Sequence, residues 1–186
     1  AAAGECLECH LPHGGERIAM LKENPDALCL TCHQDITDPQ QAAHLHQPVA
    51  EGRCTSCHDA HRSDRAALLA APTPMVCTTC HPDVMAPAGT ASIHPPSQGD
   101  CLACHRPHGG PDRALLTKPS PALCFDCHDE EGQNFQANHL GRDGLQIDCS
   151  SCHAANHSEQ PGLLYANVHP PFEGRECDAC HAATAG

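Results

Sequence analysis

The chain has almost no aromatic side chains and few long aliphatic ones. Phe, Tyr and Trp make up 2% of its 186 residues, and Trp is absent. Leu, Ile, Val and Phe together account for only 27 residues, while the net charge is -13. A chain so poor in apolar residues and so highly charged is normally disordered, because it cannot bury enough apolar surface to offset its conformational entropy. The polypeptide therefore cannot build a sufficient core by itself.

Long regular segments are missing as well. The 17 Pro and 14 Gly residues are spread along the chain and leave little room for long helices or a sheet. No apolar run approaches the roughly 18 residues that a membrane-spanning helix needs. Lys and Arg number 10 against 23 Asp and Glu, so neither nucleic acid nor an anionic membrane is expected as a partner.

Cysteine and histidine are abundant instead, with 16 Cys and 17 His. Every Cys belongs to a Cys-x-x-Cys pair, and His directly follows each of the eight pairs. This is the attachment sequence of c-type haem, in which two thioethers hold the porphyrin and the adjacent imidazole is the proximal iron ligand. The predicted motifs are Cys6, Cys9 and His10; Cys29, Cys32 and His33; Cys54, Cys57 and His58; Cys77, Cys80 and His81; Cys101, Cys104 and His105; Cys124, Cys127 and His128; Cys149, Cys152 and His153; and Cys177, Cys180 and His181.

Three other uses of Cys-x-x-Cys pairs compete with haem. The spacing from Cys6 to Cys32 lies within the range of structural zinc sites, which makes zinc the sharper rival. Disulfides suit a Cys-rich exported chain but give no reason for the histidines. Thioredoxin-like redox pairs require a βαβ context that the chain lacks. Because His would follow all eight pairs by chance with a probability on the order of 10⁻⁸, haem is the preferred interpretation.

The motifs are organised as an internal repeat. Two motifs form a unit, and the opening cysteines of successive units lie 47 or 48 residues apart, which indicates stacked or chained units. Fourteen residues after each opening Cys lies an apolar pair, expected to cover a haem face. These pairs are Met20-Leu21, Leu68-Leu69, Leu115-Leu116 and Leu163-Leu164. Short helices are predicted over residues 16 to 22, 64 to 70 and 112 to 117.

A longer period of 95 residues is superimposed on these units. The sequence that begins at Cys6 as CLECHLPHGG returns from Cys101 as CLACHRPHGG. This duplication predicts two four-haem halves, residues 1–93 and 94–186. We expect mostly irregular coil with short α-helices wrapped around a chain of eight c-type haems, and little or no β-sheet.

Nine histidines lie outside the motifs, enough to supply a second axial ligand for eight irons. Most recur at fixed distances from a motif, and His44 and His46 compete for one role. Met20, Met75 and Met85 share no such position, so we expect bis-His ligation throughout and low reduction potentials. The candidate distal ligands are His13, His44, His46, His61, His94, His108, His139, His157 and His169.

The spacing of some of these histidines predicts how the haems are connected. His10 and His13 are at most about 11 Å apart and are separated by a stiff proline, so they cannot readily hold both faces of one haem. His13 should instead reach the iron of a neighbouring haem. The same relation applies to His61 and to His108, and repeating it would give a continuous chain of haems.

The eight motifs resemble those of multihaem c-type cytochromes of the doubled Cys-x-x-Cys-His type, and the chain is similar to extracellular cytochrome nanowire subunits. The resemblance implies eight covalently attached haem c groups, added after export, and hence an extracellular or periplasmic location. The start at Ala1-Ala2-Ala3-Gly4 fits a mature form after signal cleavage.

Coordinatively saturated irons transfer electrons and have no open position for a substrate. We therefore expect no enzymatic activity but electron transfer, as the subunit of a conductive filament that self-associates and serves redox proteins or an extracellular acceptor. The alternative is a soluble periplasmic shuttle. A multihaem reductase of nitrite or hydroxylamine is disfavoured, because all eight motifs end in His.

Overall fold

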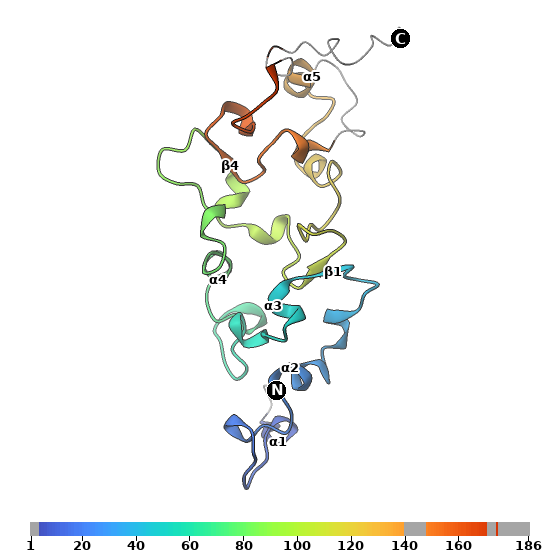
Figure 1. The fold of residues 1–186 in the computed structure, drawn as a ribbon, viewed down its shortest axis with the longest axis vertical. Coiled ribbons are helices and arrows are strands. Elements are labelled where there is room, and N and C mark those ends of the chain that lie inside the picture. Colours follow the sequence, from blue (N-terminus) through green and yellow to red (C-terminus); the bar gives the residue numbers. More distant parts are fainter. Residues whose placement is uncertain (1–3, 140–147, 171–173, 175–186) are drawn as a thin grey trace.

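The computed structural model describes residues 4–139, 148–170 and 174. The eighth motif lies outside the described residues, so the haem attachment predicted for Cys177, Cys180 and His181 stays a prediction. The chain is elongated, and its units follow one another along the long axis, with α1 (Cys6–Cys9) near one end and α5 (Gln133–His139) near the other (Figure 1).

Regular elements are short and scattered through coil. The remaining α-helices are α2 (Pro25–Leu30), α3 (Gln47–Ala50) and α4 (Thr73–Thr78). Single 3-10 turns are η1 (Ile18–Met20), η2 (Gln34–Thr37), η3 (Cys54–Ser56), η4 (Ala66–Leu68), η5 (Pro82–Val84), η6 (Pro95–Gln98), η7 (Cys101–Ala103), η8 (Cys124–Asp126), η10 (Cys149–Ser151) and η11 (Pro161–Leu163). This confirms the prediction of a mostly irregular chain with short helices and little β-sheet.

Two pairs of two-residue strands connect distant parts of the chain. β1 (His44–Leu45) pairs antiparallel with β3 (Gly109–Gly110). β2 (Ser92–Ile93) pairs in the same way with β4 (His157–Ser158). Each pair joins the segment before one unit to the segment after the opening motif of a later unit. Both pairs also cross from residues 1–93 to residues 94–186.

Glycine is required where β1 meets β3. A Cβ atom on Gly109 would lie 2.7 Å from the Cβ of Ala42 and 2.8 Å from the carbonyl oxygen of His44. Such contacts are too close for any side chain, so the backbone approach at this point depends on Gly109. The contact fixes the segment that carries His46 beside the segment that carries His108.

Over residues 4–139 and 148–170, the polypeptide does not form a hydrophobic core of its own. Across the described ranges, Ala42 is the one buried hydrophobic residue and Ser158 the one buried polar residue, each 8% exposed. Large apolar side chains remain at the surface, including Ile18, which is 92% exposed. A chain with so little internal packing needs another source of apolar contact to be stable.

The predicted helices at 16 to 22, 64 to 70 and 112 to 117 are wrong. The first two positions hold only the three-residue turns η1 and η4, and the third contains no helix. The reason is local backbone geometry. Ala19 has a φ of 57° and Leu115 a φ of 56°, and a left-handed residue ends a right-handed helix.

Candidate haem-binding sites

Each described motif is a single helical turn. In all seven, the backbone N–H of the histidine donates to the carbonyl of the first cysteine, at 2.9 to 3.1 Å. Residues at positions i, i+3 and i+4 of such a turn lie on one side. The two thiols and the imidazole of every described motif are therefore presented together, as attachment of one porphyrin requires.

The seventh motif shows that the fourth unit keeps this construction. Cys149 and Cys152 are both half-buried, and the backbone N–H of Cys152 donates to the carbonyl of Cys149 at 3.2 Å. The carbonyl of Cys152 accepts from the backbone N–H of Tyr165, the residue after the apolar pair, at 3.3 Å. The carbonyls of Cys9, Cys57 and Cys104 accept from the matching residues Lys22, Ala70 and Thr117 at 2.8 to 2.9 Å. Cys180 and His181 of the second motif in this unit lie outside the described residues. The first motif is therefore the one haem site of this unit that the structure describes.

The proximal histidines of the four opening motifs are oriented by the same hydrogen bond. Each ring Nδ1 lies 2.7 to 2.8 Å from a backbone carbonyl nine residues further on. Because a carbonyl can only accept, Nδ1 carries the proton and Nε2 keeps the lone pair that binds iron. The bonded pairs are His10 with Ala19, His58 with Ala67, His105 with Ala114 and His153 with Gly162.

The loop that supplies these carbonyls is strained in a repeated way. The residue after each of these carbonyls has left-handed backbone in all four units, with φ values of 54° to 60°; these residues are Met20, Leu68, Leu115 and Leu163. Left-handed backbone costs a residue with a Cβ about 1 kcal/mol or more, so its recurrence indicates a required geometry. That geometry aims the carbonyl at the proximal imidazole.

Five proximal histidines lie opposite a second imidazole. Two rings that bind one iron from opposite sides have centroids about 6 Å apart, because each metal–nitrogen bond is about 2 Å long. The observed separations are 5.8 to 6.1 Å, with interplanar angles from 17° to 49°. The residues therefore fit bis-His haem. The pairs are His10–His61, His58–His108, His81–His46, His128–His94 and His153–His139.

Two of these pairs connect successive units. His61 lies opposite His10 of the preceding unit and not opposite His58, three residues away from it in the chain. His108 relates to His58 in the same way. This arrangement agrees with the expectation from the three-residue spacing.

His46 is distinguished from its competitor His44 by its position. The ring of His46 lies 6.0 Å from that of His81, and its Nδ1 donates to the carbonyl of Pro107 at 3.0 Å. His44 lies in β1, is exposed, and pairs with no imidazole ring within the described residues. The structure thus places His46 and not His44 opposite a proximal ligand.

Several predicted ligands have no such ring pair in the part of the chain that the structure describes. They are the proximal His33 and His105 and the candidate distal ligands His13, His44, His157 and His169. His157 instead has its Nε2 at 2.9 Å from the carbonyl of Asp83. The proximal ligand His181 falls on residues that the structure does not describe, so its ring partner is not assigned.

Burial of His108 favours the neutral form of its imidazole ring. Desolvation, reinforced by the neighbouring His58, lowers the pKa of His108. The ring therefore stays neutral at neutral pH, and a neutral imidazole is the form that binds a metal.

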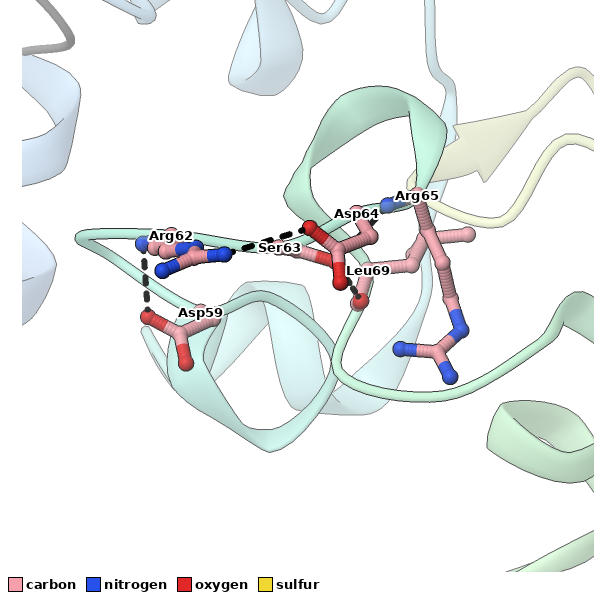
Figure 2. Close-up of polar contacts among 6 residues, drawn as sticks. All are labelled: Asp59, Arg62, Ser63, Asp64, Arg65 and Leu69. Carbon is pink, nitrogen blue, oxygen red and sulfur yellow. Dashed lines mark hydrogen bonds and ion pairs between the residues drawn. The ribbon is translucent and has the colours of Figure 1, made fainter.

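A compact loop carries His61. The carboxylate of Asp59 accepts a hydrogen bond from the backbone N–H of His61 at 2.9 Å. It accepts a second one from the backbone N–H of Arg62 at 3.1 Å (Figure 2). These two bonds lower the pKa of Asp59. They stabilise the loop above the ordinary Asp pKa and are lost as the pH falls through the lowered value.

Ser63 closes the same loop. Its hydroxyl donates to the carbonyl of Leu69 at 2.6 Å and accepts from the backbone N–H of Arg65 at 3.1 Å (Figure 2). Ser158 makes the equivalent bond to Leu164 in the fourth unit.

Removing this hydroxyl should loosen the His61 loop. We expect Ser63→Ala to lower the free energy of unfolding of the haem-bearing protein by about 1 kcal/mol, because a part-buried carbonyl loses its donor. Guanidinium denaturation followed by haem absorbance would measure the change. Ser56→Ala is the matched control, since Ser56 is exposed and its hydroxyl makes no hydrogen bond among the described residues. Equal stability of the two variants would contradict the role of Ser63.

Cysteines of successive motifs lie next to one another. The thiols of Cys77 and Cys101 are neighbours, and burial together with the Cys101 thiol raises the pKa of Cys77 to about 11. The same contact joins Cys124 to Cys149, where burial and the neighbouring thiol raise the pKa of Cys124 to about 11. Consecutive attachment points therefore adjoin where one unit meets the next.

The rival uses of cysteine find no support in this arrangement. No group of three or more His, Cys, Asp or Glu side chains gathers to hold a metal ion directly within residues 4–139, 148–170 and 174. None of the fourteen cysteines in those ranges forms a disulfide. The side chains are arranged for a flat group held between two imidazoles, which neither a zinc site nor a disulfide requires.

Comparison with known proteins agrees with this geometry. The family model described as doubled CXXCH motif matches residues 1–38, 46–86 and 94–133, more than half of the chain. The model for cytochrome c554 and c-prime matches residues 142–182. No curated protein matches the chain. No helix in the described ranges is long and apolar enough to cross a membrane. The chain belongs to the doubled CXXCH family and is a multihaem c-type cytochrome whose motifs bind haem c covalently and support electron transfer.

Proposed function

We propose that the chain binds eight haem c groups and conducts electrons along its length without catalysing a reaction. The observation that carries the proposal is the set of five imidazole pairs, two of which, His10–His61 and His58–His108, link one unit to the next. Haem supplies one-electron redox chemistry when bound. The protein's part is to hold the irons of these five sites between two imidazoles, which leaves no position for a substrate there, and to keep consecutive attachment sites adjacent.

The protein works outside the cytoplasm as the subunit of a conductive filament. Support comes from the first unit. His61 and His108 each lie opposite a proximal histidine of another unit, and His13 occupies the equivalent position of the first unit. His13 is exposed and pairs with no imidazole in the described ranges. A haem of a neighbouring molecule is a fitting target for this ligand.

The structure changes which histidine is the best candidate for such a contact between molecules. From the sequence, His44, His46 and His94 are the first candidates for such a ligand. The rings of His46 and His94, however, lie 6.0 Å from those of His81 and His128 in the same chain. Neither His44 nor His13 has such a partner within the described residues, but His13 shares with His61 and His108 the position three residues after a proximal histidine, so it is the proposed ligand in trans.

Electron microscopy of the haem-bearing protein at micromolar concentration, with an optical spectrum of the same sample, tests the proposal. We expect filaments and a predominantly low-spin spectrum, and the intact mass should show eight haems. His13→Ala should give discrete particles. His44→Ala, which changes an exposed histidine between the second and third motifs, should still assemble. Discrete wild-type particles would remove the filament and leave a soluble carrier, and fewer than eight haems would overturn the haem number.

A further inference from the structure

The fourth unit departs from the others at the position that supplies a distal ligand. Three residues after the proximal histidine of the opening motif, the second unit has His61 and the third has His108. Both face a proximal histidine of the preceding unit. The fourth unit has Asn156 at this position.

The backbone shows that Asn156 and His108 occupy equivalent places. His108 directly precedes β3, and its carbonyl accepts from the backbone N–H of His46 at 3.0 Å. Asn156 directly precedes β4, and its carbonyl accepts from the N–H of His94, also at 3.0 Å. Asn156 therefore occupies the same place in the fold as His108, and the backbone contacts agree with the alignment of the repeats.

The adjacent His157 does not take over the missing role. It pairs with Ile93 in the β2–β4 ladder, and successive side chains of a strand point to opposite faces. Its Nε2 lies 2.9 Å from the carbonyl of Asp83. Since a carbonyl only accepts, this nitrogen carries the proton, so the nitrogen of His157 that keeps a lone pair is Nδ1 and not the Nε2 that the paired histidines His46 and His139 leave for iron.

The haem site that a histidine at position 156 would complete keeps its proximal ligand in the usual arrangement. By the order of the repeat, this is the motif of Cys101, Cys104 and His105. The Nδ1 of His105 donates to the carbonyl of Ala114 at 2.8 Å, as its three counterparts do to theirs. Those counterparts, His10, His58 and His153, each face an imidazole at 5.8 to 6.1 Å. Within the described residues, His105 faces none.

We propose that the haem held by Cys101, Cys104 and His105 has an open distal position beside Asn156 and binds a small uncharged π-acceptor ligand such as carbon monoxide or nitric oxide. The Asn156 side-chain amide has no hydrogen-bond partner among the described residues and is available to donate to the ligand. The net charge of -13 disfavours an anion at the same place. The site is an addition to electron transfer and requires only that this motif carries haem.

Carbon monoxide titration of the reduced, haem-bearing protein tests this site. Bound carbon monoxide is counted per chain from the difference spectrum, and high-spin iron is measured in the oxidised protein by electron paramagnetic resonance. We expect Asn156→His to bind one equivalent less than the wild type and to lose one high-spin signal. The reverse variant, His108→Asn, should gain one equivalent, because it copies the fourth unit into the third.

Two further variants test the open distal position if Asn156→His does not fold or bind its haems. His157→Ala should bind as much carbon monoxide as the wild type, whereas a gain of one equivalent would identify His157 as the ligand and overturn the proposal. Asn156→Leu should keep the stoichiometry and release carbon monoxide roughly 2- to 10-fold faster, the loss of one hydrogen bond. A wild type without high-spin iron or carbon monoxide binding would also overturn the proposal.

Discussion

A chain in which serine replaces all sixteen motif cysteines should be unfolded, whereas the haem-bearing protein should unfold cooperatively on heating. The described residues bury little more than Ala42 and Ser158, and the sequence has only 27 Leu, Ile, Val and Phe side chains. Burial of that size cannot offset a conformational entropy cost of about 1 to 2 kcal/mol per ordered residue. Apolar contact must come from porphyrin faces, and thioether bonds must hold them in place.

Circular dichroism and amide hydrogen exchange of the two proteins would measure this difference. The cysteine-free chain should show a coil spectrum and no protected amides. A double variant, Cys77→Ser with Cys80→Ser, serves as the graded control because it removes one attachment site and should lose protection mainly around α4 and η5. A cooperative thermal transition in the cysteine-free chain would show that the polypeptide folds without haem.

The general character of the fold was predictable because it follows from composition and motif count. Too few apolar residues, frequent Pro and Gly, and eight identical motifs predict coil around a repeated prosthetic group. The spacing of His10 and His13 also predicted that a histidine at this place serves a different unit, and His61 opposite His10 shows this relation. The prediction of coil and the prediction that this histidine serves another unit both follow from composition and from distances along the chain, so neither requires knowledge of the tertiary structure.

The failures have a common cause, which is backbone geometry set by distant contacts. Apolar residues such as Ala19 and Leu115 favour helix by propensity, yet they adopt left-handed φ values where the loop turns toward a proximal imidazole. The choice between His44 and His46 depended on the β1–β3 register, which joins residues far apart in the chain. The presence of Asn156 at the position of His108 was visible in the sequence, but His157, one residue further on, is the nearest histidine and was therefore included in the series.

Replacing His108 with methionine should raise the midpoint potential of one haem by on the order of 100 mV, because a thioether donates less electron density to ferric iron than an imidazole does. The ring of His108 lies 5.9 Å from that of His58, so this haem is expected to change while the others keep their ligands. Potentiometric titration with optical detection should show one component moving away from the low-potential group.

The control for His108→Met is Leu102→Met, which adds a thioether at a position 48% exposed without touching an imidazole pair. It should leave the titration unchanged. If His108→Met also left every potential unchanged, His108 would not be an axial ligand, and the pairing of His58 with His108 would have no role in ligation. The variant could instead gain a carbon monoxide site without a higher potential. That result would show that methionine does not reach the iron and that His108 is the ligand in the wild type. Only a shifted, six-coordinate component establishes that the distal side chain of this position sets the potential of a haem attached in the preceding unit.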